Sequence, residues 1–264
     1  MNNYRPSFWN SIPPVVKNLI IINFILWLAT AVFEMRGFNL NNILGMHYWA
    51  STKFNPAQVI TYMFMHGGFS HFFFNMFALF MFGGMLERMW GGRRFLFYYL
   101  VTGLGAGIIQ QVVWTIEMQP TLNALNTMIS EGSAENIGMY TQTLGRYFKT
   151  EYLSPALGLN GLLQMQQAFQ SEILDMVVTV GASGSIFGIL LAYGMLFPNS
   201  EIYIMFIPIP IKAKYFVIFY GLLELYLGFA NRVGDSVAHF AHLGGMLFGL
   251  ILILYWKKKG RLYS

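Results

Sequence analysis

Six apolar stretches dominate this chain of 264 residues and are long enough to cross the roughly 30 Å of hydrocarbon in a bilayer, some of them with tilt or with a start below the surface. They cover about 15–34, 69–86, 95–115, 183–197, 213–230 and 237–256. Hydrophobic residues make up 56% of the chain and charged residues only 10%, whereas a soluble domain has roughly 25% charged residues. The sequence therefore predicts an all-α polytopic membrane protein with six transmembrane helices.

Lysine and arginine residues indicate how these helices are oriented. With an even number of spans both termini lie on one side, and the basic residues that flank the spans fall on that same side. They are Arg5, Lys17, Arg88, Arg93, Arg94, Lys212, Lys214, Lys257, Lys258, Lys259 and Arg261. The positive-inside rule then makes both termini cytoplasmic. The first span could also be a signal peptide cleaved near Ala29-Thr30-Ala31, but its polar leader is long for that interpretation.

The connection between the third and fourth spans, about 117–176, is a polar insertion. It carries six acidic and two basic residues, so we expect it on the extracytoplasmic side. Leu122 to Ile129 and Leu159 to Leu174 show partial helical periodicity and predict short amphipathic helices. We interpret residues 1–264 as a single membrane domain that contains this insertion.

A serine flanked by glycines opens the fourth span, in Thr179-Val180-Gly181-Ala182-Ser183-Gly184-Ser185-Ile186-Phe187-Gly188. The glycines allow a tight turn and a close approach of other backbones, so that Ser183 would lie in the first turn of a helix that starts below the outer membrane surface. The amides and the dipole of a helix N-terminus favour an alkoxide or a developing oxyanion. Ser183 is therefore a candidate nucleophile. Taken alone, however, the motif fits a helix-packing face with Ser183 as a cap better.

The sixth span carries His239 and His242, in a setting where an imidazole is costly and marks a candidate functional residue. A stripe of small residues lies beside His242 and fits the glycines of the fourth span, which would hold His242 near Ser183 as its base. The stripe consists of Ala241, Gly245 and Gly249. We assign His239 to a hydrogen bond with Asp235 at the mouth of the site. No carboxylate is placed to orient His242, so the prediction is a dyad.

The second span adds His71 and Asn75, which are four residues apart and share one helix face near the outer leaflet. Two such donors could hold an oxyanion, each contributing roughly 3 kcal/mol in a dry site. The alternative, that they bond each other or hold a loop, is equally consistent with this pair. His66 is expected to brace the loop before this span, and His47 has no assigned role.

Two acidic residues in or next to the spans need partners. Glu87, at the inner end of the second span, is expected to pair with the neighbouring arginines. Glu224, in the middle of the fifth span, needs a partner or a proton, and we favour a structural hydrogen bond over a contact with substrate.

Three motifs in order, His71-x-x-x-Asn75, Gly181-x-Ser183-Gly184 and Ala241-His242-x-Gly244-Gly245, resemble the rhomboid family of intramembrane serine proteases, of the bacterial type. The resemblance covers nearly the whole chain outside the insertion. It implies that Ser183 is the nucleophile and His242 the base. It also implies that the side chains of His71 and Asn75, with the backbone amide of Ser183, stabilise the oxyanion.

The same resemblance implies cleavage of transmembrane helices of membrane proteins near their extracytoplasmic end, with no cofactor. We accordingly expect a multi-pass protein of the bacterial cytoplasmic (inner) membrane. The chain departs from the family's pattern in two places: the connection between spans three and four is usually short, and the loop over 36–68 lacks the usual Trp-Arg pair. Substrate preference is the property that these departures would change.

Two other functions are considered beside the protease. A proteolytically inactive rhomboid-like protein would bind membrane helices without cleaving them, which the presence of all the site residues argues against. A transporter or metal permease would use His239-x-x-His242 as a ligand pair, but we find no matching acid in the other spans. The expected partners are membrane-protein substrates and the lipid bilayer. We expect no metal ion, because no acid matches the histidine pair, and no nucleic acid, because the net charge of +5 gathers at the cytoplasmic ends of the spans.

Overall fold

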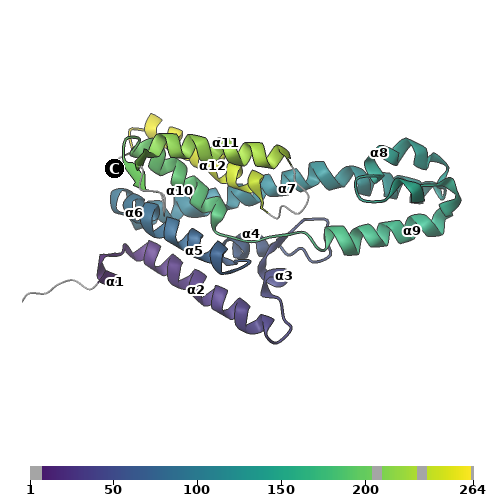
Figure 1. Ribbon diagram of the computed structural model, residues 1–264, viewed down its shortest axis with the longest axis horizontal. Helices are drawn as coiled ribbons and strands as arrows, with labels where there is room; N and C mark the ends of the chain where they lie inside the picture. Colours follow the sequence, from purple (N-terminus) through teal and green to yellow (C-terminus); the bar gives the residue numbers. More distant parts are fainter. Residues whose placement is uncertain (1–7, 204–209, 231–236, 263–264) are drawn as a thin grey trace, which may run out of the picture. The chain divides into compact units, whose positions relative to one another are not determined.

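The computed structural model describes residues 8–203, 210–230 and 237–262, and nearly all of their regular structure is helical (Figure 1). The chain divides into two compact units, which are described one at a time. The first unit comprises residues 1–45, 57–110 and 179–264, and the second comprises residues 46–56 and 111–178. The expectation of one membrane domain with an insertion over about 117–176 stays a prediction.

The first unit consists of helices and one short hairpin. Its elements are α1 (Phe8–Ser11), α2 (Pro14–Glu34), α3 (Leu40–Leu44), α4 (Gln58–Thr61), the 3-10 helix η1 (Tyr62–Phe64), α5 (Phe69–Ala78), the π-helix η2 (Leu79–Gly83), α6 (Gly84–Trp90), α10 (Ser183–Leu196), β3 (Glu201–Tyr203), β4 (Pro210–Lys212), α11 (Ala213–Ala230) and α12 (His239–Lys258). Strands β3 and β4 pair antiparallel, with Ile202 opposite Ile211. Helices α10, α11 and α12 lie side by side (Figure 1).

The second unit is built from shorter elements. They are β1 (Met46–His47), η3 (Glu135–Tyr140), α8 (Thr141–Leu144), η4 (Thr150–Tyr152), η5 (Pro155–Leu157), α9 (Gly158–Ala168) and the π-helix η6 (Phe169–Leu174). Two elements cross from one unit to the other, α7 (Gly92–Glu131) and β2 (Val178–Thr179). Leu159 to Leu174 is helical as predicted, because it coincides with most of α9 and all of η6.

Among the described residues, five helical segments are long and apolar enough to cross a membrane. They are Pro14–Glu34, Phe69–Trp90, Gly92–Glu131, Ala213–Ala230 and His239–Lys258. These segments coincide with five of the six predicted spans and confirm the all-α polytopic class. The remaining span coincides with α10, whose 14 residues reach about 21 Å at 1.5 Å per residue. The count of six spans, with the fourth starting below the surface, stays a prediction.

The third helix is longer than its apolar stretch predicts. We expected a span over 95–115 and then a polar insertion, whereas α7 continues to Glu131. Pro120 lies inside it, although proline removes one helical hydrogen bond and usually ends or kinks a helix. The polar residues after 115 are thus compatible with helix, and Leu122 to Ile129 is helical as predicted, but as the end of α7 rather than as a separate element.

Small residues let α10 and α12 pack so closely that their backbones are in contact. A methyl group added at Gly245 would collide with the carbonyl oxygen of Gly184. One added at Gly249 would lie 3.4 Å from the Cα atom of Gly188. The carbonyl oxygen of Gly188 accepts a hydrogen bond from Tyr98 Oη at 2.7 Å. The predicted fit between the glycines of the fourth span and the small-residue stripe of the sixth is therefore confirmed. This contact fixes the first two turns of α10 against the first three turns of α12.

Glu87 has different partners from those predicted. Its two carboxylate oxygens accept hydrogen bonds from the backbone amides of Val15, at 2.9 Å, and Val16, at 2.7 Å. These amides belong to the first turn of α2, where helix geometry leaves amides without intrahelical acceptors and the dipole favours a negative charge. Arg88 instead donates to the carbonyl of Ser11 at 2.8 Å. Glu87 is therefore a cap for another helix, and the expected arginine pairing is wrong.

In the second unit, one carboxylate organises the chain around it. Asp175 accepts hydrogen bonds from the hydroxyl of Ser51 at 2.8 Å, from the amide and hydroxyl of Thr52 at 2.8 and 2.6 Å, and from the amide nitrogen of Gln170 at 2.9 Å. Burial raises the pKa of this carboxyl, but the hydrogen bonds together outweigh burial and lower the pKa to about 2. Residues 51–52 and the end of η6 are held together through this side chain.

Candidate active site

A tight turn places Ser183 at the start of α10. Gly181 has a φ of 132°, a conformation that residues with a side chain rarely adopt, and its amide donates to the carbonyl of Tyr62 at 2.9 Å. A methyl group at this position would lie 2.7 Å from Nε2 of His71. Glycine is therefore needed at 181 both for the backbone conformation and for the close approach of His71 on α5.

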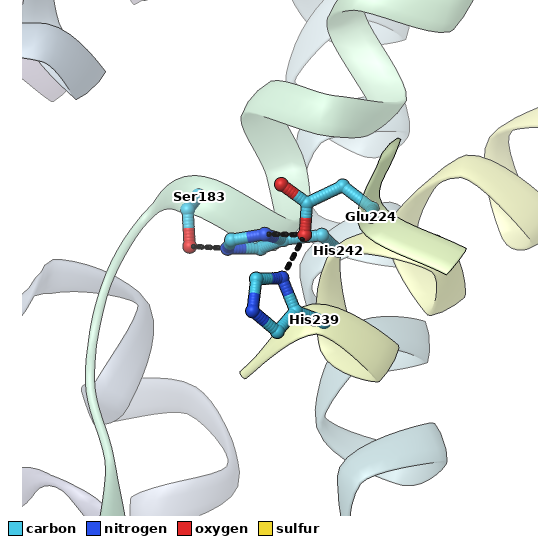
Figure 2. Close-up of polar contacts among 4 residues, drawn as sticks. All are labelled: Ser183, Glu224, His239 and His242. Atoms are coloured by element: carbon cyan, nitrogen blue, oxygen red, sulfur yellow. Dashed lines mark hydrogen bonds and ion pairs between the residues drawn. The ribbon is translucent and has the colours of Figure 1, made fainter. Parts of the chain in front are cut away.

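The structure brings Ser183 and His242 together, from the first residue of α10 and the first turn of α12. The Ser183 Oγ atom lies 2.8 Å from Nε2 of His242 (Figure 2). Ser183 is half-buried and His242 is buried. This is the distance and the pairing of a serine hydroxyl with a general base. Their catalytic roles are a proposal.

A carboxylate lies on the other side of His242, contrary to our expectation of a dyad with no such group. Oε2 of Glu224, on α11, is 2.9 Å from Nδ1 of His242 (Figure 2). The same oxygen is 2.7 Å from Nδ1 of His239. The sequence indicated only that Glu224 needs a partner, because nothing in it fixes how α11 rotates against α12. Of the two functions weighed for Glu224, a hydrogen bond within the protein is the one found, and its partners are the two histidines.

The expected partner of His239 was Asp235, which lies outside the described residues. Within them, His239 binds Glu224 and is itself buried. His239 and His242 are one helical turn apart, so both rings reach the same neighbouring helix. Figure 2 shows the two imidazoles converging on one oxygen of Glu224.

An aromatic ring covers one face of the histidine. Phe187 lies one turn after Ser183 in α10, and its ring stacks on that of His242 with centroids 4.2 Å apart and planes 9° apart. Sequence reasoning did not single out this residue. The signal was present, since residues four apart on a helix share a face and the partner of Ser183 must pass over the position of Phe187.

His71 and Asn75 lie on α5, and they differ in burial and in their contacts. His71 is half-buried and reaches Gly181, two residues before Ser183. Asn75 is buried, and its Nδ2 atom has no hydrogen-bond partner among residues 8–203, 210–230 and 237–262, His71 included. A buried amide without a partner is costly. The Nδ2 atom of Asn75 is therefore available to a group that enters the site. The alternative, that Asn75 and His71 bond each other through this atom, does not hold in the structure.

The two remaining histidines are His66, before α5 in the first unit, and His47, in the second unit. His66 is buried, and its ring meets those of His71 and Phe72 edge-on at 5.1 and 5.5 Å, while its role in bracing the loop stays a prediction. Burial, followed by the neighbouring His71, lowers the pKa of His66 to about 3, so it is neutral at physiological pH. His47 belongs to the second unit, where its carbonyl accepts from Gln111 at 2.7 Å.

Among the described residues, one cluster of side chains could hold a metal ion: Glu224, His239 and His242, whose ligand atoms lie within 4.8 Å of one another. From the sequence we argued against a metal or transport function, because no acid was found to match the two histidines. That argument is wrong, since Glu224 supplies the acid from another helix. The same atoms are nevertheless at hydrogen-bond distance from each other, so each already has a partner without an ion.

The fold and these side chains define a polytopic helical membrane protein with a serine and a histidine in contact between its helices. The family model of the Rhomboid domain matches residues 53–121 and 143–259, which is more than half of the chain. The chain therefore belongs to the rhomboid family. Between these two ranges the family model leaves out residues 122–142, which fall within the predicted insertion.

A curated protein of Bacillus subtilis (strain 168), "Putative rhomboid protease YdcA", is 34% identical to this chain over 108 residues. These residues are 38% of this chain and 48% of that protein, so the chain matches about half the length of the relative. The relative's name supports a rhomboid protein. The activity and the substrates of the present chain are proposals.

Proposed function

We propose that this protein is an intramembrane serine endopeptidase that cleaves transmembrane helices of membrane proteins near their extracytoplasmic end, with Ser183 as nucleophile and His242 as base. The observation that carries the proposal is the 2.8 Å contact between Ser183 Oγ and His242 Nε2 in an apolar helical protein. A polar pair among apolar helices is costly, so it is expected to have a function. Membership of the rhomboid family suggests that this function is proteolysis.

The reaction begins with transfer of the Ser183 hydroxyl proton to Nε2 of His242. The Oγ atom then forms a bond to the substrate carbonyl carbon, and the carbonyl electron pair moves onto oxygen. Collapse of this intermediate breaks the C–N bond, and the amine leaves with the proton from Nε2. Water then attacks the acyl-enzyme, with His242 again accepting a proton, and releases a carboxylic acid and free Ser183.

Donors around Ser183 would stabilise the oxyanion. The buried Nδ2 atom of Asn75 lacks a partner in the described structure, and His71 reaches the turn that carries the serine. The amide of Ser183 itself belongs to the first turn of α10, which has no side-chain cap. Preorganised donors of this kind contribute most in a site that excludes bulk water.

A fluorophosphonate probe tests the proposal without knowledge of the substrate. In proteoliposomes the wild-type protein should be labelled at Ser183, and both Ser183→Ala and His242→Ala should abolish labelling. Ser185→Ala is the matched control, because Ser185 lies two residues along the same helix and donates to the carbonyl of Tyr99 at 2.7 Å instead. Its labelling should equal that of the wild type.

The same assay separates the protease from its main rival. A proteolytically inactive rhomboid-like protein would bind a labelled membrane helix but would neither cleave it nor react with the probe. A wild-type protein that stays unlabelled while folded, and that releases no fragment from single-span helices in the bilayer, would overturn the proposal.

A further inference from the structure

We propose that Glu224 is a third member of this site: a positioning residue that fixes the tautomer and the orientation of His242, with His239 holding the carboxylate in place. The inference rests on the proposed function of Ser183 and His242. The role of Glu224 goes beyond that function, because a serine and a histidine alone would leave Nδ1 of His242 without a defined partner.

The shared oxygen determines where the protons are. An ionised carboxylate only accepts hydrogen bonds, so Nδ1 of His242 and Nδ1 of His239 must both carry a proton to donate to Oε2 of Glu224, at 2.9 and 2.7 Å. A neutral His242 then has a free electron pair on Nε2, the atom that faces Ser183 at 2.8 Å. This is the one neutral tautomer that can accept the serine proton.

The carboxylate also suits the charged state of the base. When His242 takes the proton of Ser183 it becomes an imidazolium ion, which is unfavourable in an apolar site unless a negative charge lies close by. Glu224 is 4% exposed and lies on the far side of the ring from the serine. It can therefore stabilise the cation without competing with the substrate for Nε2.

His239 gives the carboxylate a second donor. A single hydrogen bond would leave Glu224 free to turn about its last torsion, whereas two donors from one helix, three residues apart, fix the same oxygen from two directions. Two hydrogen bonds to one ionised oxygen also offset part of the cost of burying it. His239 thus acts on the serine only through Glu224 and His242.

A purely structural role is the alternative that the experiment must exclude. The buried residues of α11 are Ala213, Val217 and Glu224, which lie on one stripe of the helix, so the carboxylate could simply tie α11 to α12. A tether would affect the stability of the protein and the amount of folded material. It would not affect the protonation pattern of His242 or the rate at which each folded molecule reacts.

The test compares fluorophosphonate labelling rates of folded protein in proteoliposomes. Glu224→Gln keeps the shape of the side chain but removes its charge, and should slow labelling of Ser183 by about 100-fold or more at neutral pH. His239→Leu should slow it by about tenfold, and His239→Asn, which restores an N–H donor near the position of Nδ1, should recover most of that loss. Thermal unfolding in the same lipids reports any loss of folded protein separately.

A spectroscopic measurement distinguishes positioning from tethering. In nitrogen-15 NMR spectra of histidine-labelled protein, His242 of the wild type should be protonated at Nδ1 only, and Glu224→Gln should give a mixture of both tautomers. A folded Glu224→Gln protein that is labelled as fast as the wild type, or that keeps the single tautomer, would overturn the inference. The proposed function would survive that result, whereas an unlabelled wild-type protein would refute the proposed function itself.

The metal-binding potential of the same cluster is tested in parallel. If Glu224 acts on His242 directly, the purified protein should be labelled at the same rate with and without the membrane-permeant chelator phenanthroline. Loss of labelling with the chelator, together with a stoichiometric transition metal in elemental analysis, would mean that the three side chains hold an ion. That result would overturn the inference.

Discussion

Two buried carboxylates in the apolar helices of the first unit, Glu87 and Glu224, differ in what surrounds them. They are 3% and 4% exposed. Glu87 accepts from two backbone amides at the start of α2, and Glu224 accepts from two imidazoles of α12. Both are thus satisfied by two N–H donors, as a buried carboxylate must be.

The difference lies in what the donors can do. A backbone amide keeps its proton at every accessible pH, so the interaction of Glu87 is the same whatever reaction takes place nearby, and its effect is on folding. An imidazole can gain, lose or move a proton, so the interaction of Glu224 changes with the state of its partners. Identical burial therefore indicates a cap in one case and, on our inference, a positioning group in the other.

Glu87→Gln should have the largest effect on stability of the substitutions considered below. It should lower the free energy of unfolding by about 3 kcal/mol, because hydrogen bonds from amides to an ionised group are lost and one of the two amides then faces an N–H donor. Reversible denaturant unfolding in mixed micelles measures this change. Labelling of Ser183 per folded molecule should match that of the wild type.

The contrast between Glu87 and Glu224 can be tested by comparing their glutamine variants. Glu224→Gln should destabilise the protein less than Glu87→Gln does, since an amide oxygen in the place of Oε2 can still accept from both imidazoles, while slowing the labelling of Ser183 far more. If Glu87→Gln instead slowed labelling as strongly as Glu224→Gln, the two carboxylates would have the same kind of role.

Asp175 offers a third carboxylate, outside the membrane-length helices of the first unit, whose donors are hydroxyls and amides. Its pKa of about 2 lies below the ordinary value of 3.8, so the protonated form is disfavoured in the folded state. Its contribution to stability is complete above the unfolded pKa and is lost as the pH falls from about 4 through about 2. The shift corresponds to about 2 kcal/mol.

Hydrogen exchange of the Thr52 amide, which donates to Asp175, measures this contribution locally. Protection of that amide should fall steeply between pH 4 and pH 2, after correction for intrinsic exchange, by a factor that matches about 2 kcal/mol. In Asp175→Asn the extra loss of protection should be absent over the same range. An unchanged pH dependence in this variant would show that another group holds residues 51–52.

The two carboxylates of the first unit also show how far the sequence determines the fold and the site. Apolar length predicted five helices that the structure contains, and the glycines at 184, 188, 245 and 249 predicted which helices touch. Both are local properties of the chain, so composition and spacing carry them. The partners of Glu87 and Glu224 were not predicted, because they depend on how one helix is rotated against another.

The same distinction applies within the site. The meeting of Ser183 and His242 could be predicted, since each lies beside small residues on the two helices that pack most closely. The contact of Glu224 with both histidines depends on α11, whose exposed apolar residues give no indication of which side faces inward. Its one strong signal was the cost of a carboxylate in an apolar span, which identifies a residue that has a partner but does not name that partner.

The smallest effect is expected at Phe187. This residue contacts the face of the His242 ring, whereas Glu224 contacts its edge. Phe187→Leu removes a parallel ring 4.2 Å away and should cost about 1 kcal/mol, or about a fivefold slower labelling of Ser183, while Phe187→Tyr keeps the ring and most of the rate. If both contacts serve to orient the same imidazole, the effect of Phe187→Leu should largely disappear when Glu224 is already Gln. Equal effects in both backgrounds would mean that the ring only packs against His242, and that orientation comes from the carboxylate alone.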